Sequence, residues 1–178
     1  MNLEEKTVHI QPIFTGRVIS LQVEDVILPD GKKSKREVVK HPGAVAVIAQ
    51  TVENKIILVE QYRKALERTI IEIPAGKLEL NENPADCAKR ELEEETGYTC
   101  ETVTQIQKFY TSPGFADELI YIFEASQVEK VENGLVKDED EFVNLLEVSL
   151  EEAEQLIAQE KIIDAKTVFA INYLKMKK

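Results

Sequence analysis

The sequence of 178 residues predicts an α+β protein. Short runs along the chain are either wholly apolar or alternate polar and apolar residues, as strands do, while three other stretches repeat apolar residues at helical spacing. The predicted strands and helices do not alternate regularly. This order favours a mixed sandwich of sheet and helices over a regular parallel βαβ fold.

The first forty residues predict a β-hairpin. Residues 17–28 alternate polar and apolar side chains, Pro29-Asp30-Gly31 marks a turn, and residues 36–40 return as a second strand. An isolated hairpin is only marginally stable and needs another surface to cover it. We therefore expect an N-terminal β-sheet segment over residues 1–42 and a main domain over residues 43–178.

The sequence of the main domain predicts further strands and helices, and it contains no linker or internal repeat. Strands are expected at residues 44–49, 56–59, 69–73, 103–110, 119–123 and 142–148. Amphipathic helices are expected at residues 150–158 and 166–176.

A third helix, which follows the strand at residues 69–73, has well-marked ends. Asn83 suits the N-cap, Pro84 the first helical position, and Asp86 the positive end of the helix dipole. Gly97 ends the helix because glycine adopts positive φ at no steric cost. One face of the helix is apolar, with Ala85, Ala88 and Leu92.

The other face of this helix is acidic. Glu91, Glu94 and Glu95 project together because residues three and four apart share a face, whereas Glu93 points elsewhere. Three neighbouring carboxylates repel one another unless a positive charge sits among them. A hard divalent cation such as Mg²⁺ meets this need, since it prefers oxygen ligands and acts beside substrate phosphates.

Composition narrows the classes of partner. Hydrophobic residues make up 43% of the chain and charged residues 31%, and the net charge of −11 argues against nucleic acid or anionic membrane as a general partner. The first six residues are acidic without the apolar stretch of a signal peptide, and no apolar run reaches membrane-spanning length, so we expect no secretion signal or membrane span. Cys87 and Cys100 form no metal motif, so we expect reduced, partly buried thiols in a cytoplasmic protein.

Residues 76–98 resemble the signature of the Nudix hydrolases. The residues in register are Gly76, Glu82, Arg90, Glu91, Leu92, Glu94, Glu95 and Gly97. Tyr98 departs from the pattern, which usually ends on an aliphatic residue. The alternative is a solvated acidic helix, but eight spaced matches in a strand–loop–helix context favour the motif.

The resemblance implies a fold and a metal site. The fold is a mixed β-sheet between helices with an additional N-terminal antiparallel β-sheet. Glu91, Glu95 and the main-chain carbonyl of Ala75 become expected ligands of Mg²⁺, with Mn²⁺ as an alternative. Glu94 joins the catalytic residues and binds metal either directly or through water.

The resemblance also assigns other charged residues. Arg90 is expected to orient carboxylates, and Glu82 either ties the loop or contacts metal. In the acidic run at residues 138–141, Glu139 is the expected base and Glu141 an additional metal ligand. Such a run otherwise simply faces water.

Outside the signature, the chain resembles the ADP-ribose pyrophosphatases within this family. Pro113 lies fifteen residues beyond Tyr98, and Gln61-Tyr62-Arg63 precedes the signature. The implied reaction is Mg²⁺-dependent hydrolysis of ADP-ribose to AMP and ribose 5-phosphate. The alternatives are another nucleoside diphosphate derivative as substrate, or a non-catalytic nucleotide-binding module. Such modules usually lose a signature acid, whereas this chain keeps them all.

Seven residues are the expected substrate-binding set: Arg36, Arg63, Lys77, Ser112, Pro113, Gly114 and Glu118. Arg36 is otherwise an exposed hairpin charge, and Arg63 otherwise pairs with a carboxylate on its own strand. Pro113 and Gly114 otherwise form an ordinary turn. Relatives of this kind are homodimers that exchange N-terminal sheets, so we expect the same here.

Overall fold

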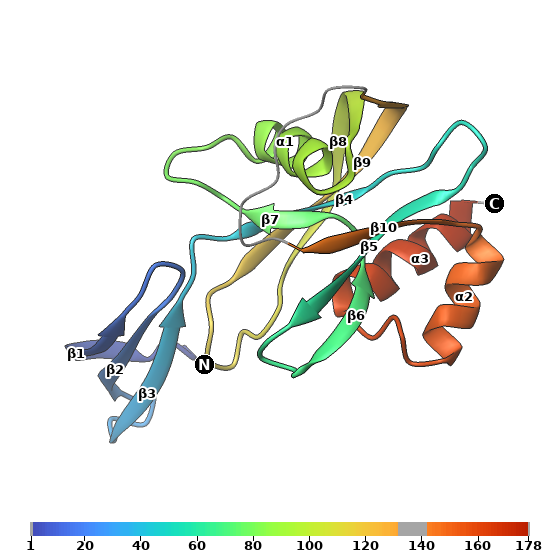
Figure 1. Ribbon diagram of the computed structural model, residues 1–178. Helices are drawn as coiled ribbons and strands as arrows, with labels where there is room; N and C mark the ends of the chain where they lie inside the picture. Colours follow the sequence, from blue (N-terminus) through green and yellow to red (C-terminus); the bar gives the residue numbers. More distant parts are fainter. Residues whose placement is uncertain (1, 132–141, 178) are drawn as a thin grey trace. The chain divides into compact units, whose positions relative to one another are not determined.

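The computed structural model describes residues 2–131 and 142–177 (Figure 1). The chain divides into two compact units, of which unit one holds residues 1–43 and 109–120, and unit two holds residues 44–108 and 121–178. The expected division between residues 42 and 43 stays a prediction. Residues 109–120, which the prediction assigned to the main domain, belong to the same compact unit as the N-terminal segment.

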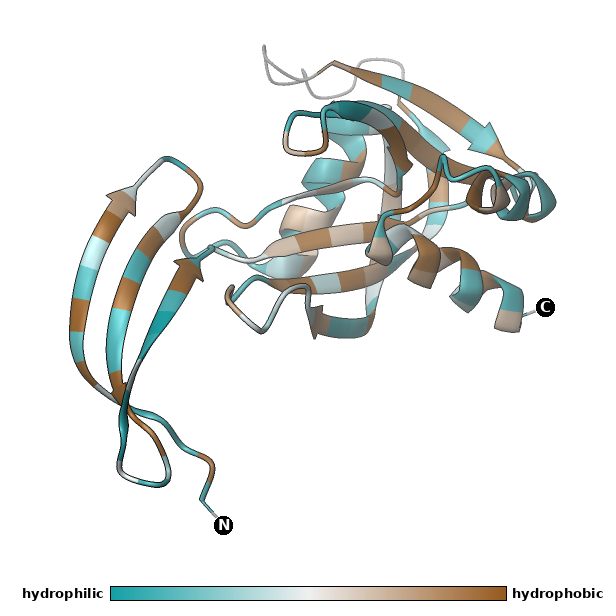
Figure 2. Cartoon of the chain, turned by 90° about the horizontal axis from the view of Figure 1, so that it is seen from below, coloured by the Kyte–Doolittle hydropathy of each residue, from teal (hydrophilic) through white to brown (hydrophobic). Residues whose placement is uncertain are grey.

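Unit one contains a three-stranded antiparallel sheet in the order β1-β2-β3. The strands are β1 (Lys6–Thr15), β2 (Ser20–Ile27) and β3 (Lys33–Lys40). The predicted hairpin is β2–β3, and Gly31 in its turn has a φ of 84°. The prediction lacked β1, whose residues are all exposed although polar and apolar side chains alternate along part of it. Figure 2 shows polar and apolar residues alternating along these strands.

The segment at residues 109–120 attaches to the end of β3. The Val39 N–H donates to the carbonyl of Phe115 at 2.8 Å, and the Asp117 N–H donates to the carbonyl of Val39 at 3.2 Å. The carboxylate of Asp117 also pairs with Lys40 at 3.0 Å. Although burial opposes ionisation, Lys40 and the His41 N–H lower the pKa of Asp117. The loop before Asp117 is therefore fixed relative to β3.

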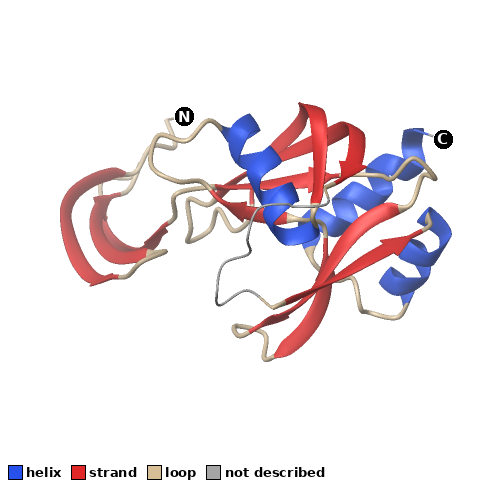
Figure 3. Cartoon of the chain, turned by 45° about the horizontal axis from the view of Figure 1, so that its top comes forward, coloured by secondary structure: helices blue, strands red, loops and turns tan. Residues whose placement is uncertain are grey.

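Unit two contains two sheets and three helices (Figure 3). The sheets have the orders β10-β5-β6 and β7-β4-β9-β8, and β8 and β9 continue into unit one. The strands are β4 (Ala44–Ile48), β5 (Ile56–Arg63), β6 (Arg68–Glu72), β7 (Ala75–Lys77), β8 (Tyr98–Tyr110), β9 (Leu119–Lys130) and β10 (Val143–Val148). The helices are α1 (Pro84–Thr96), α2 (Leu150–Ala158) and α3 (Ala165–Lys177).

The ends of α1 lie where the sequence predicts them. The Asn83 side chain accepts from the Ala85 N–H at 2.9 Å. Gly97 has a φ of 69° and donates its N–H to the carbonyl of Glu93 at 2.8 Å. The buried face of α1 includes Cys87 as well as the expected Ala88 and Leu92, and it packs against β4 and β7.

Strand β4 explains why unit two has a layered core. All five of its residues are buried, and alternate side chains of a strand point to opposite faces. Val45 and Val47 join the cluster against α1, so Ala46 and Ile48 are buried on the other face. Full burial of each aliphatic side chain stabilises the fold by about 1.5–3 kcal/mol. The predicted α+β class, with helices covering a sheet layer, is confirmed.

Among the described residues, none of the three helices is both long enough and apolar enough to cross a bilayer.

Candidate active site

The site begins where the backbone of β7 meets the side chain of Glu91 on α1. A Cβ built on Gly76 would lie 1.8 Å from the carboxyl carbon of Glu91 and 2.0 and 2.1 Å from its oxygens. The Glu91 carboxylate occupies the space that any side chain at residue 76 would need, so glycine is the residue that fits there. Glu91 is only 8% exposed, so this contact is an interior one.

Glu95, one helical turn after Glu91, lies against the same strand. The Ala75 N–H donates to Oε2 of Glu95 at 2.9 Å, and Glu95 is 3% exposed. Residues four apart on a helix share a face, so Glu91 and Glu95 present adjacent carboxylates to the Ala75–Gly76 backbone. Two buried acids are thus held by main-chain geometry.

Arg90 compensates the negative charge of this face. Its Nη1 donates to Oε1 of Glu91 at 2.8 Å and to Oε2 of Glu94 at 2.7 Å. Its Nε and Nη2 donate to the two carboxylate oxygens of Glu82 at 3.0 and 3.1 Å. Hydrogen bonding to Glu82 raises the pKa of Arg90, and the same contact lowers the pKa of Glu82 to about 2. Arg90 therefore stays charged and orients three carboxylates.

Glu82 ties down the loop between β7 and α1. Its Oε2 accepts from the Glu79 N–H at 2.9 Å in addition to the fork from Arg90. The sequence left open whether Glu82 ties the loop or contacts metal, and these contacts are those of a loop tie. The neighbouring thiol of Cys87 lies 3.3 Å from Nη2 of Arg90. Burial, followed by the nearby Glu82, raises the pKa of Cys87 to about 12.

The residues present suit a divalent cation. Within residues 2–131 and 142–177, no three His, Cys, Asp or Glu side chains are grouped as metal ligands, and Arg90 bonds both Glu91 and Glu94. Nevertheless, the buried carboxylates of Glu91 and Glu95 beside the main chain of Ala75 form a set of hard oxygen donors, which Mg²⁺ and Ca²⁺ prefer.

Arg63 and Lys77 are the predicted substrate-binding residues of unit two. Nε and Nη2 of Arg63 donate to Oε2 of Glu72 at 2.9 and 2.5 Å. The carboxylate partner of Arg63 therefore lies on the neighbouring strand β6, and not on its own strand β5 as one alternative expected. Lys77 is exposed at the end of β7, and its main-chain carbonyl accepts from the Cys87 thiol at 3.5 Å.

The other predicted substrate-binding residues belong to unit one. Arg36 on β3 forms a two-bond ion pair with Glu5, at 2.7 and 2.5 Å. The carbonyl of Ser112 accepts from the N–H groups of residues 115 and 116 at 3.1 and 2.9 Å. These bonds close a turn that exposes Pro113 and Gly114.

Glu118 closes the loop between β8 and β9 by bonding to Thr111. Its carbonyl accepts from the Thr111 N–H at 3.2 Å, its carboxylate accepts from the Thr111 hydroxyl, and Nε2 of His41 lies 3.6 Å from its Oε1. The predicted base Glu139 and the predicted ligand Glu141 lie outside the described residues.

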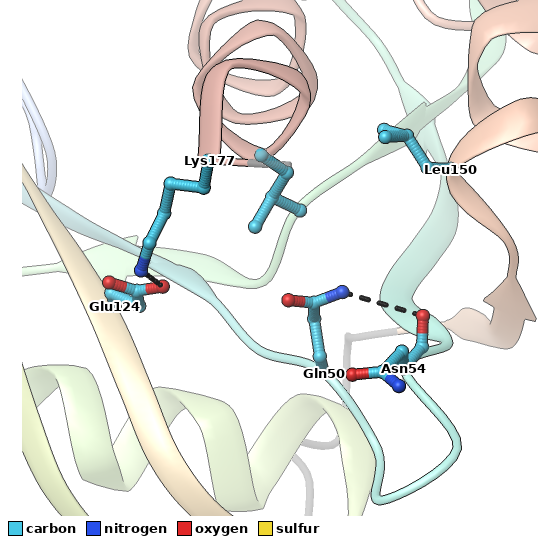
Figure 4. A pocket seen from close by; sticks show the side chains of 6 residues that line it. Gln50, Asn54, Glu124, Leu150 and Lys177 are labelled. Atoms are coloured by element: carbon cyan, nitrogen blue, oxygen red, sulfur yellow. Dashed lines mark hydrogen bonds and ion pairs between the residues drawn. The ribbon is translucent and has the colours of Figure 1, made fainter.

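Unit two also has a separate pocket, of about 430 Å³ (Figure 4). Its lining comes from the loop after β4, from β9, from the start of α2 and from the end of α3, and contains none of the predicted site residues: Gln50, Asn54, Glu124, Leu150, Leu174 and Lys177. Lys177 donates to Glu124 at 2.7 Å on one side of this pocket.

Sequence reasoning missed the surroundings of Arg63. Glu72 is 3% exposed and also pairs with Lys166, the second residue of α3, at 3.2 Å. The available signal was a charged residue within the apolar run Ile70-Ile71-Glu72-Ile73, because a buried carboxylate requires a cationic partner.

Comparison with known proteins identifies the family. The NUDIX domain model matches residues 40–170. The chain belongs to the Nudix family. It is 59% identical over 176 residues to the ADP-ribose pyrophosphatase of Bacillus subtilis, covering 99% of this chain and 95% of that protein. It is also 59% identical over 173 residues to the methanol dehydrogenase activator of Bacillus methanolicus, covering 97% and 94%.

A solved structure supports the fold. The crystal structure of an ADP compounds hydrolase superposes with a TM-score of 0.85 at 19% identity, covering 99% of this chain and 95% of the other. In this Nudix protein, α1 is therefore the helix that carries the signature. Nudix ADP-ribose pyrophosphatases generally depend on a divalent metal ion, which agrees with the buried pair of Glu91 and Glu95.

Proposed function

We propose that this Nudix protein hydrolyses ADP-ribose to AMP and ribose 5-phosphate with Mg²⁺ as its cation. The observation that carries the proposal is the pair of buried carboxylates, Glu91 and Glu95, seated on the Ala75–Gly76 backbone. The likeness to a protein named ADP-ribose pyrophosphatase, at 59% identity over nearly the full length, supports the choice of substrate.

The diphosphate of such a substrate carries two negative charges, which repel the electron pair of an attacking water molecule. A bound divalent cation neutralises phosphate charge and acidifies a water molecule. The protein's own part is preorganisation, since Ala75 and Gly76 hold two carboxylates in place before substrate arrives. Arg90 keeps Glu91 and Glu94 oriented without leaving their charges uncompensated.

In the proposed reaction, water adds to one phosphorus and the bond from that phosphorus to the bridging oxygen breaks. Glu139 accepts the proton of the water, and Glu141 provides an additional metal ligand; both assignments come from the family resemblance. A Glu139→Gln variant should turn over ADP-ribose far more slowly while binding it with nearly unchanged affinity. Unchanged turnover would reject Glu139 as the base.

The proposed substrate contacts follow the chemistry of each side chain. Arg63 and Lys77 offer cationic groups to the diphosphate, and Arg36 offers a planar cation that can stack on adenine. The hydrogen-bonding groups left for the terminal ribose are those of Ser112, Pro113, Gly114 and Glu118.

We also propose a cytoplasmic homodimer that exchanges its N-terminal sheets and has no nucleic-acid or membrane partner. Val8, Ile10 and Phe14 on β1 are 55%, 48% and 55% exposed, which is an unusual density of apolar surface for one strand. The net charge of −11 and the two unpaired cysteines agree with the partners and compartment proposed. A monomer in sedimentation at micromolar concentration would contradict the dimer.

The deciding experiment is chromatographic product analysis with Mg²⁺. Wild-type protein and a Glu95→Gln variant would be compared on ADP-ribose, GDP-mannose, NADH and diadenosine compounds. The proposal expects AMP and ribose 5-phosphate from ADP-ribose at the highest rate, with the activity lost in the variant. Faster cleavage of another compound would overturn the substrate, and binding without cleavage would indicate a nucleotide-binding module.

A second candidate function is activation of a methanol dehydrogenase, because the relative named for that role is equally similar to this chain. The test is the rate of a methanol dehydrogenase with and without this protein. Stimulation by wild-type protein but not by Glu95→Gln would join this role to the hydrolytic site. An unchanged dehydrogenase rate would exclude it.

A further inference from the structure

A buried ionic network lies where β5, β6 and the first turn of α3 meet, and β6 ends three residues before Ala75 of the proposed site. Glu72, which is only 3% exposed, lies at the centre of this network. Arg63 donates twice to Oε2 of Glu72, and Nζ of Lys166 lies 3.2 Å from Oε1 of Glu72. One buried carboxylate therefore joins two cations from different elements.

The first turn of α3 fixes the ammonium group of Lys166. Lys166 is 8% exposed, and its Nζ lies 3.0 Å from Oδ2 of Asp164. The same oxygen of Asp164 accepts from the N–H and the hydroxyl of Thr167 at 3.0 and 2.7 Å. The Thr167 hydroxyl oxygen in turn accepts from the Ile73 N–H at 2.9 Å. Helix α3 therefore holds both the side chain of Glu72 and the backbone that follows it.

The network leaves one edge of Arg63 available. Nε and Nη2 both bind a single oxygen of Glu72, and within the part of the chain that the structure describes Nη1 has no protein acceptor. The side chain of Arg63 is 41% exposed. A planar guanidinium held along one edge presents its other edge in a fixed direction, which suits a bidentate oxyanion such as a phosphate.

Lys166 and Arg63 contact different oxygens of the Glu72 carboxylate. Because Lys166 occupies Oε1, Oε2 remains directed at Arg63. Without the ammonium group, the carboxylate would turn within its pocket to satisfy both oxygens, and the guanidinium would follow it. A buried ion pair contributes little net stability compared with apolar packing, so orientation is the better account of this costly arrangement.

We infer that Lys166 is a positioning residue that orients Arg63, through Glu72, for the diphosphate of the substrate. Lys166 itself touches no substrate. The inference rests on the proposed function, because the binding of a diphosphate by Arg63 is part of that proposal.

The test is a double-mutant cycle on the KM for ADP-ribose. Residues coupled through a shared ion pair depart from additivity, so we expect Lys166→Met to raise KM by about tenfold with kcat within about threefold. Arg63→Met should raise KM at least as much. The double variant should resemble Arg63→Met alone, since Lys166 acts only through Arg63.

Two variants separate positioning from stability. Lys166→Arg keeps the cation and should restore most of the wild-type KM. Lys166→Met combined with Glu72→Gln removes the opposite charges of both side chains, so no carboxylate oxygen at residue 72 is left without its cation, and this variant should fold with KM still raised. Lys161→Met, at an exposed lysine five positions earlier, is the matched control and should leave KM unchanged.

The outcomes distinguish this inference from the proposed function. Active wild-type enzyme with unchanged KM in both folded Lys166→Met variants would overturn the inference alone, as would effects of Lys166→Met and Arg63→Met that simply multiply. Wild-type protein that fails to cleave ADP-ribose would overturn the proposed function and, with it, the inference.

Discussion

The contact between Gly76 and Glu91 allows a sharp prediction for the variant Gly76→Ala. The new Cβ would lie 1.8 Å from the carboxyl carbon, and ordinary contact begins at 3.4 Å, so the carboxylate must move by 3.4 − 1.8 = 1.6 Å. Misplacement of a reacting group by about 1 Å can slow a reaction about 100-fold. We therefore expect kcat on ADP-ribose to fall by at least about 100-fold at saturating Mg²⁺.

The same substitution should leave the fold nearly intact. The displaced group is the end of a flexible side chain, and the backbone of Gly76 does not require positive φ. Losing the charged hydrogen bond from Arg90 to Glu91 costs about 1.5–3 kcal/mol, while alanine restricts the unfolded chain and stabilises by about 0.4–1 kcal/mol. The free energy of urea unfolding should therefore fall by about 0.5–2.6 kcal/mol.

Gly97→Ala provides the opposite control. Gly97 has a φ of 69° with nothing within 4 Å of an added Cβ. Alanine there should cost about 1–2 kcal/mol of stability because of its left-handed backbone, yet the folded enzyme should keep its kcat. A Gly76→Ala enzyme with kcat within threefold of wild type would refute the argument that the Glu91 carboxylate must sit against bare backbone.

Three further predictions concern titratable residues on α1 or close to it. Glu95→Gln can still accept from Ala75, so the variant should unfold at a normal urea concentration while losing hydrolysis of ADP-ribose; retained activity would exclude Glu95 as a metal ligand. The hydrogen bonds from Arg90 lower the pKa of Glu82 from its ordinary value of 4.5 to about 2 in the folded protein. Ionised Glu82 therefore stabilises the fold above pH 4.5, and this stabilisation is lost as the pH falls toward 2. Urea unfolding from pH 5 to pH 2 should show about 3 kcal/mol more loss in wild type than in Glu82→Gln, and parallel curves would contradict the pairing. Burial raises the pKa of Cys87 to about 12, and burial also raises the pKa of Cys100 above its ordinary value. Ellman's reagent at about pH 8 should therefore react with neither thiol before unfolding, and rapid reaction of the native protein would count against this burial.

Local signals explain what could be predicted from the sequence. Helix α1 has its cap, its first-position proline and its terminal glycine within fifteen residues, and each lies where the sequence predicts it. The acidic face of α1 follows from helical spacing alone. Buried runs such as β4 are recognised because both faces of the strand are apolar.

Features that depend on distant pairing could not be predicted in this way. Strand β1 is exposed throughout and pairs with β2 by backbone hydrogen bonds, a pairing that its own residues do not specify. The network around Glu72 joins residues far apart in the chain: Ile73 meets Thr167 across 94 positions. The sequence showed that Glu72 is an odd residue in an apolar strand, but only the fold identifies Lys166 as its partner.

The attachment of residues 109–120 to β3 has a consequence for how the protein can be cut or recombined. Val39 exchanges hydrogen bonds with Phe115 and Asp117, so unit one is assembled from two stretches of chain separated by residues 44–108, which include all of α1. A single cleavage near residue 43 cannot release this unit whole. Grafting the N-terminal strands from one relative onto another would place a foreign β3 against a native loop. The loop and the strand must therefore be exchanged together, because these two separate stretches of the chain form one structural unit.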